Sequence, residues 1–186
     1  SNYLLFHSLA ELFSIAVAWA LFMLTWNTRH LMTDGYLLFL SIAYLFISGI
    51  DLAHTLTYKG MGVFSAYDAN LPTQLWIAAR YLQSLSLLVA PLFSRRKVNA
   101  YWIAAVYTVL LSLIMLSTFY AEALPWGAFP DCYVEPGGLT TFKKVSEYII
   151  SLILLDSIGL MQHYREQCDR KIWRLLVGSI MLTMFA

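Results

Sequence analysis

Charged residues are scarce in this sequence. Lys, Arg, Asp and Glu make up 12% of the 186 residues, whereas about 25% is usual for soluble domains. Hydrophobic residues account for 60% of the chain, and the mean hydropathy is +0.65. Soluble globular domains rarely have such a composition, so the sequence predicts that lipid surrounds most of the chain.

Several familiar motifs are missing as well. The sequence contains no P-loop, HExxH, CxxC or GxSxG pattern, and therefore nothing indicates phosphate binding or nucleophilic catalysis. The basic residues are spread over short loops and the net charge is only +1, which gives no reason to expect a nucleic-acid partner. We expect that this chain by itself is not an enzyme.

Long apolar runs are what the sequence does have. Five of them are long enough to cross the hydrocarbon core of a bilayer, which takes about 20 helical residues. A sixth begins near Ile172 and is still running at Ala186, so we expect residues 1–186 to be one C-terminally truncated transmembrane domain of a longer protein. The predicted fold is all-α, a polytopic transmembrane helix bundle with the full spans Tyr3–Trp26, Tyr36–Tyr58, Leu75–Phe93, Ala100–Ala121 and Val145–Tyr164.

The distribution of Lys and Arg predicts the orientation of this bundle. Alternate connections carry eight basic residues on one side (Arg29, Arg95, Arg96, Lys97, Arg165, Arg170, Lys171 and Arg174) and three on the other (Lys59, Lys143 and Lys144). Because basic loops stay in the cytoplasm, the N-terminus is predicted outside. Residues 59–74 and 122–144 are then two long outer loops, and Cys132 outside cannot pair with Cys168 inside.

Five polar residues are predicted to lie at one depth within the membrane. His7 and Glu11 are spaced i,i+4 on the first span, Asp51 and His54 are spaced i,i+3 on the second, and Arg80 is on the third. The helical rise of about 1.5 Å per residue puts them roughly 6–12 Å below the outer end. Charged residues inside a span are costly and usually face the protein interior, where they mark a pocket or a path.

Two interpretations of this polar layer are open. It is either a structural ion-pair network in which Arg80 bridges Asp51 and Glu11, or a pocket for a ligand. The candidate ligand-binding residues are His7, Glu11, Asp51, His54, Tyr58, Arg80, Gln83 and Ser84. His7, Glu11 and His54 could bind a transition metal, and His7 with His54 could instead be the axial ligands of a haem. Two further acids are expected to be buried, Glu147 near the outer start of the fifth span and Asp156 facing the bundle interior near mid-membrane.

Three stretches carry a resemblance to a known family. They are NYLLFHSLAELFSI (2–15), YLFISGIDLAHTLTYKGMGVF (44–64) and DANLPTQLWIAARYLQSLSLLVAPLF (68–93). From about Tyr3 to its end the chain resembles the third family of bacterial membrane-associated sensor (MASE) domains. Gln83 stands where that resemblance leads us to expect Glu.

The resemblance implies a sensory input domain in the bacterial inner membrane. Such domains precede histidine kinase, diguanylate cyclase or PAS modules, so the implied partners are the lipid bilayer, a small ligand of unknown identity, a cytoplasmic output domain in the same chain and a second copy in a homodimer. It also implies a seventh span, which an outside N-terminus and a cytoplasmic output require as well. Two other functions stay open, a transporter or channel bundle, favoured by the intramembrane charges, and a passive anchor or dimerisation domain.

Overall fold

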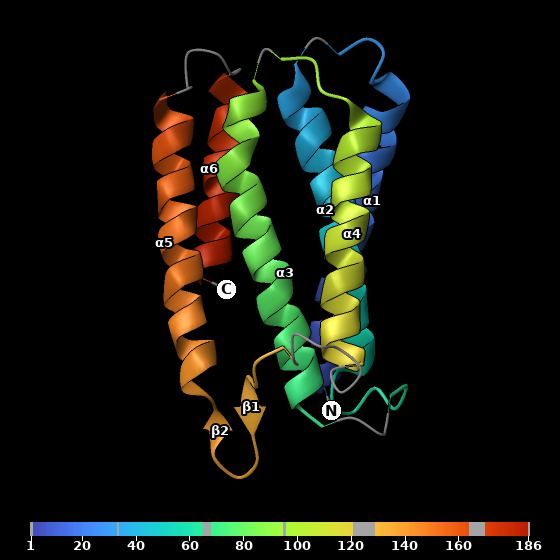
Figure 1. Cartoon of the computed structure of the whole chain (residues 1–186), viewed down its shortest axis with the longest axis vertical. Coiled ribbons are helices and arrows are strands. Elements are labelled where there is room, and N and C mark those ends of the chain that lie inside the picture. The colour runs from blue at the N-terminus through green and yellow to red at the C-terminus, as the bar shows by residue number, and fades with distance from the viewer. Residues whose placement is uncertain are drawn as a thin grey trace.

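The computed structural model describes residues 2–32, 34–64, 68–94, 96–120, 129–163 and 170–185. Within these ranges the chain forms six α-helices and one short hairpin (Figure 1). The helices are α1 (Asn2–Thr28), α2 (Gly35–Thr57), α3 (Asn70–Val89), α4 (Ala100–Phe119), α5 (Thr141–His163) and α6 (Arg170–Phe185). The 3-10 helix η1 (Ala90–Phe93) extends α3, and β1 (Tyr133–Val134) pairs antiparallel with β2 (Gly138–Leu139).

The predicted transmembrane bundle is confirmed. In the described part of the chain, five helices are long and apolar enough to cross a membrane, with mean hydropathies from 1.3 to 2.0. They are α1 to α5, with the third span running on through η1 to Phe93, and the shorter apolar helix at Trp173–Met184 lies within α6. The chain is therefore a multi-pass membrane domain.

Two boundaries differ from the sequence prediction. Helix α3 begins at Asn70 and not at Leu75, so the last residues of the predicted outer loop 59–74 are helical. Proline is tolerated there because the first turn of a helix has no use for its missing N–H group. Part of the predicted outer loop 122–144 forms the hairpin β1–β2, and α5 already begins at Thr141.

Helices α2 and α3 form the centre of the bundle. Helix α2 packs against α1, α3 and α4, and α3 packs against α5, which in turn contacts α6. The central pair supplies most of the fully buried large side chains, among them Ile42, Ile47, Leu75 and Ile77. Helix α4 buries only Ala100, Tyr107 and Thr118, so nearly its whole apolar surface faces outward, as expected for a helix in lipid.

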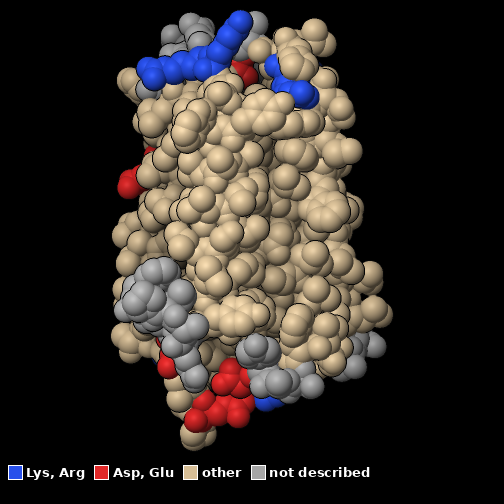
Figure 2. All heavy atoms as spheres, turned by 45° about the vertical axis from the view of Figure 1, so that its right-hand side comes forward, with Lys and Arg blue, Asp and Glu red and all other residues tan. Residues whose placement is uncertain are grey.

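Charged side chains gather at the two ends of the bundle. Figure 2 shows basic atoms at one end, mostly acidic atoms at the other and a broad, almost uncharged belt between them. The connections from α1 to α2 and from α3 to α4 lie at the basic end, and the N-terminus lies at the other end with the hairpin (Figure 1). This alternation matches the predicted loops, and the cytoplasmic assignment of the basic end stays a prediction from charge.

The hairpin is fastened to the first turn of α3. The Asn70 side chain donates to Asp131 Oδ1 at 2.7 Å and accepts from the backbone N–H groups of Cys132 (2.8 Å) and Tyr133 (3.0 Å). One turn later, Gln74 Nε2 donates to the Phe129 carbonyl at 2.8 Å. The N-terminal end of α3 and the hairpin therefore form one hydrogen-bonded unit.

Cys132 is fully buried beneath this hairpin. Burial raises the pKa of its thiol to about 11, because the charged thiolate loses its hydration. The thiol is consequently protonated and shielded at neutral pH, and a disulfide to another chain would require this unit to open.

Candidate functional site

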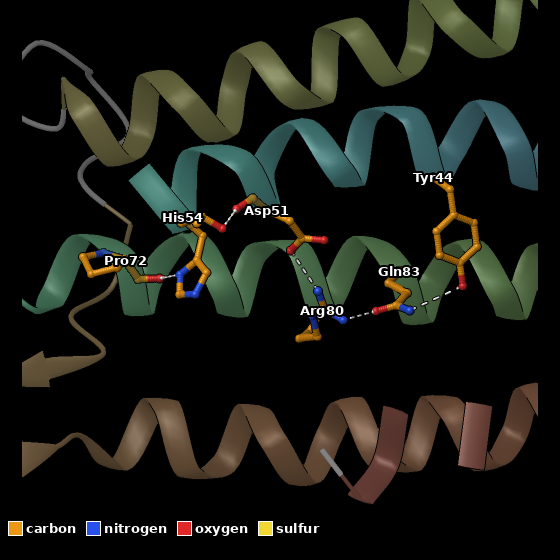
Figure 3. A network of polar contacts seen from close by, with 7 residues as sticks. Tyr44, Asp51, His54, Pro72, Arg80 and Gln83 are labelled. Atoms are coloured by element: carbon orange, nitrogen blue, oxygen red, sulfur yellow. Dashed lines mark hydrogen bonds and ion pairs between the residues drawn. The ribbon is translucent and has the colours of Figure 1, made fainter. Parts of the chain in front are cut away.

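An ion pair joins α2 to α3 in the half of the bundle that holds the hairpin, which is the half predicted to be outer (Figure 1). Arg80 Nη2 lies 2.8 Å from Asp51 Oδ1, and Arg80 Nη1 donates to Gln83 Oε1 at 2.6 Å. The Gln83 amide then donates to the Tyr44 hydroxyl at 3.4 Å, which completes the chain of contacts in Figure 3. We call these four residues the Asp51–Arg80 chain.

Helical spacing explains how the Asp51–Arg80 chain forms. Arg80 and Gln83 are spaced i,i+3 on α3, so their side chains lie on one face. Tyr44 precedes Asp51 by seven residues on α2, which is about two helical turns and again one face. The Asp51 and Arg80 side chains are only 9% and 20% exposed, and each charge is neutralised by the other.

A second polar group lies between α1 and α2. One ligand atom each from His7, Glu11 and His54 can be chosen so that all three lie within 4.8 Å of one another. The two imidazole rings meet edge to face with their centroids 5.8 Å apart, and the Tyr58 ring lies 4.5 Å from the His7 ring. We call His7, Glu11 and His54 the histidine cluster.

Hydrogen bonding fixes the orientation of the His54 ring. Its Nδ1 lies 2.8 Å from the Pro72 carbonyl oxygen, and because a carbonyl only accepts, Nδ1 carries the proton (Figure 3). In the neutral ring Nε2 then keeps its lone pair. Among the described residues, the buried Nε2 atoms of His54 and His7 both lack a hydrogen-bond partner, which is uncommon for buried polar atoms.

The structure thus divides the predicted polar layer into two groups. It corrects the prediction that Arg80 bridges Asp51 and Glu11: within the described residues, Arg80 forms an ion pair with Asp51 and none with Glu11. The second terminal guanidinium nitrogen donates instead to Gln83 on the same helix. Glu11 contributes instead to the histidine cluster.

Ser84 does not reach either group. It is fully buried, and its hydroxyl donates to the Tyr81 carbonyl at 3.0 Å within α3. A serine that bonds to its own helix in this way is satisfied by packing alone, so the prediction that Ser84 contacts a ligand has no support in the geometry.

Glu147 is not buried as predicted, since its side chain is 41% exposed. It forms an ion pair with Lys143 one turn earlier on α5, and Lys143 Nζ lies 4.9 Å from the centroid of the Trp76 ring. These residues line a cavity of about 400 Å³ together with Arg80. Glu147 therefore lies on the α5 side of Arg80.

The prediction that Asp156 faces the bundle interior is wrong for this structure, because its side chain is exposed on α5. Leu154 and Ser157 form the buried face at that level. A helix has 3.6 residues per turn, so Asp156, immediately before Ser157 in the sequence, points away from that face.

Two contributors were missed from the sequence. Tyr44 looked like one aromatic residue among many, although its spacing of seven from Asp51 could have identified it. The Pro72 carbonyl carries no side-chain signal, since a backbone acceptor is defined by the fold and not by residue type.

Comparison with known proteins gives one match. No curated protein and no solved structure matches the chain at a significant level. The family model of MASE3, described as a membrane-associated sensor domain, matches residues 1–186. Because this match covers the whole length that forms the bundle, the chain belongs to the MASE3 family of membrane-associated sensor domains.

Proposed function

We propose that this domain is the sensory input of a bacterial signalling protein, a histidine kinase of a two-component system or a diguanylate cyclase, in the inner membrane. It receives an external or membrane-borne ligand at the outer polar groups and passes a helix movement to a cytoplasmic output domain of the same chain, in a homodimer. Family membership supports the sensory role. The convergence of His7, Glu11 and His54 from two helices is the observation that supports this location for the ligand site.

The packing of α1 suits this role. Among its described residues only Ile15, Ala18 and Thr25 are buried, and α1 packs closely against α2, so a movement of α1 would be felt first by α2. The histidine cluster lies on the α1–α2 boundary, and the Asp51–Arg80 chain lies on the α2–α3 boundary. A ligand that binds one arrangement of these helices more tightly shifts the population toward it, and small helix displacements are sufficient to alter a dimer interface.

The transport alternative has less support. It rested on the charges of Asp51, Arg80 and Asp156. The first two neutralise each other, and the third lies on the outer surface of α5. A transport path needs polar groups along its length, whereas the polar groups described above gather in the outer half of the bundle.

The experiment measures the output of the intact protein in cells, as kinase phosphorylation or cyclic dinucleotide level, for wild type, His7→Ala and Glu11→Gln. The matched control is Ser112→Ala, because Ser112 is exposed on α4 and bonds only to its own helix. We expect both site variants to shift basal output several-fold at normal membrane abundance, while the control behaves as wild type.

A passive anchor predicts another result. If both site variants reach normal abundance and give wild-type output under every growth condition tested, the polar groups are structural and the sensory proposal for this site fails.

A further inference from the structure

We infer that the histidine cluster is a binding site for a divalent first-row transition-metal ion, held by the imidazoles of His7 and His54 and the carboxylate of Glu11. This inference rests on the proposed function, because it names the class of ligand that the outer polar site takes. It starts from two observations: the buried Nε2 atoms of both histidines lack a hydrogen-bond partner among the described residues, and ligand atoms of both imidazoles and of the carboxylate lie close together between α1 and α2.

The donor set selects the class of ion. Two imidazoles and one carboxylate suit zinc, copper, nickel or iron. Calcium takes six to eight oxygen ligands and magnesium keeps most of its water, so neither matches two nitrogen donors. Three protein ligands also leave a coordination position open for water or a second molecule.

The geometry needs only a small contraction. Metal–ligand bonds of about 2.0–2.2 Å put the ligands of a tetrahedral ion roughly 3.3 Å apart, compared with the 4.8 Å within which the three ligand atoms lie here. Glu11 has three rotatable side-chain bonds and is half-buried, so its carboxylate can move toward the imidazoles, and a small shift of α1 against α2 would bring the His7 and His54 rings together.

The contact between His54 and Pro72 supports a metal ligand. Histidines that bind metals usually donate their other ring N–H to a carbonyl or carboxylate, which fixes the tautomer and aims the lone pair at the ion. His54 Nδ1 makes this contact at 2.8 Å, and the whole His54 residue is only 5% exposed. The ring is held in place with an available lone pair before any ion arrives.

The surrounding charges agree with a cation. Glu11 supplies one negative charge to the ion, while Asp51 is already neutralised by Arg80 at 2.8 Å. A divalent ion would therefore leave a net charge of about +1 in the site. An anionic molecule at the open position would remove that charge, which gives the site a means of responding to small external anions as well as to the metal.

A haem fits the same residues less well. Axial histidines approach the iron from opposite faces of the macrocycle, so the space between their nitrogens must hold the porphyrin plane. Here the Glu11 carboxylate lies within 4.8 Å of ligand atoms of both rings, and it would occupy that space. A free ion uses all three donors.

The test uses the intact protein, purified in mild detergent without chelator, stripped with EDTA and titrated with Zn²⁺ and separately with Cu²⁺. Bound metal is counted by mass spectrometry, the unfolding midpoint is followed with and without metal, and a Soret band is sought in the untreated protein. We expect one ion per chain and a raised midpoint. Loss of an outer-sphere partner alone weakens metal binding about 10–100-fold, so His7→Ala, His54→Ala and Glu11→Gln should weaken it at least as much.

Two further variants separate ligation from folding. His30→Ala removes a histidine that is exposed between α1 and α2 at the other end of the bundle, and it should bind metal as wild type does. His7→Cys replaces one metal ligand with another, since thiolates bind zinc at about 2.3 Å, and it should retain Zn²⁺ where His7→Ala loses it.

Three outcomes overturn the inference: no bound ion in the wild type after reconstitution, equal binding by wild type and the ligand variants, or a Soret band that disappears with either histidine. The proposed function is tested separately by signalling output. If the ligand variants change output but no metal binds, the sensory site stands and its ligand is organic. If metal binds at these residues and output never changes, the metal site stands and the proposed sensing through it fails.

Discussion

The Asp51–Arg80 chain and the histidine cluster lie in the same half of the bundle but differ in their hydrogen bonding. In the chain, both terminal guanidinium nitrogens are bonded and Gln83 donates in turn to Tyr44, so that of the guanidinium only the Arg80 Nε is buried without a partner among the described residues. In the cluster, the Nε2 atoms of His7 and His54 are buried without a partner among the described residues. Satisfied polar groups stabilise a fold, whereas unsatisfied ones are kept at a cost and are typical of binding sites. The predictions below test this distinction.

The largest effect is expected for Arg80→Ala. This change leaves Asp51 charged and buried without its counter-ion, and breaking a buried ion pair costs about 3–5 kcal/mol. The measurement is the free energy of unfolding in mild detergent, followed by circular dichroism against added denaturing detergent.

The matching control combines Arg80→Ala with Asp51→Asn. Because the second change removes the stranded charge, the double variant should lose less stability than the sum of the two single variants. Strictly additive losses would show that the 2.8 Å contact contributes no interaction energy.

A smaller loss is expected for Gln83→Leu. Leucine has a similar size but cannot accept from Arg80 Nη1 or donate to Tyr44, so two buried polar groups lose their partner. The cost of such a loss is about 1–3 kcal/mol. In the same unfolding assay Tyr44→Phe should cost less, since only the weaker 3.4 Å contact is removed. Equal losses for both variants would contradict this order.

The histidine cluster should behave differently. His7→Phe keeps an aromatic ring against Tyr58 and removes a buried nitrogen that has no partner, so metal-free protein should change in stability by no more than about 1 kcal/mol in either direction. Metal-dependent stabilisation should disappear in the same variant. A loss comparable to that of Arg80→Ala would place His7 with the structural group.

The smallest effect is expected for the exposed ion pair of Lys59 and Glu135. Its nitrogen–oxygen distance of 3.0 Å resembles that of the buried pair, but the two side chains are 73% and 59% exposed. Lys59→Ala should therefore leave the unfolding transition unchanged within error.

The pH dependence of this pair follows from the lysine. Its hydrogen bond to Glu135 raises the pKa of Lys59, so any stabilisation is complete below the ordinary lysine pKa of about 10.5 and is lost as pH rises through the raised value. Wild type and Lys59→Ala should unfold alike between about pH 6 and pH 9. A constant difference across that range would show that the pair does contribute to stability, and a difference that varies with pH would mean that another group nearby titrates.

The spans could be predicted from the sequence because the bilayer imposes one length and one polarity on each of them. Five helices of the bundle were predicted within a few residues. The start of α3 was missed because its first turn is polar and contains Pro72, which resembles a loop in sequence. The segment before α5 was predicted only as a loop, because nothing in its sequence specifies that Tyr133 pairs with Leu139.

The depth of the site in the membrane could be predicted from the sequence, but the rotation of each helix about its own axis could not. The rise per residue placed His7, Glu11, Asp51, His54 and Arg80 at one level, and the structure brings them into two adjacent groups. Which side of each helix faces which neighbour depends on side-chain packing across the whole bundle. The pairing of Arg80 with Asp51 was predicted correctly, whereas for that reason its contact with Glu11 and the direction of Asp156 were predicted wrongly.

The attachment of the hairpin to α3 links the movements of the helices at the hairpin end of the domain. Asp131 binds Asn70 on α3 through its carboxylate, and its carbonyl accepts from the Thr140 hydroxyl at 2.7 Å, directly before α5 begins. The first turn of α3 also holds His54 through Pro72. A displacement of His54 would thus be passed through these hydrogen bonds to the start of α5. Helices α3 and α5, which are far apart in sequence, would then tilt together.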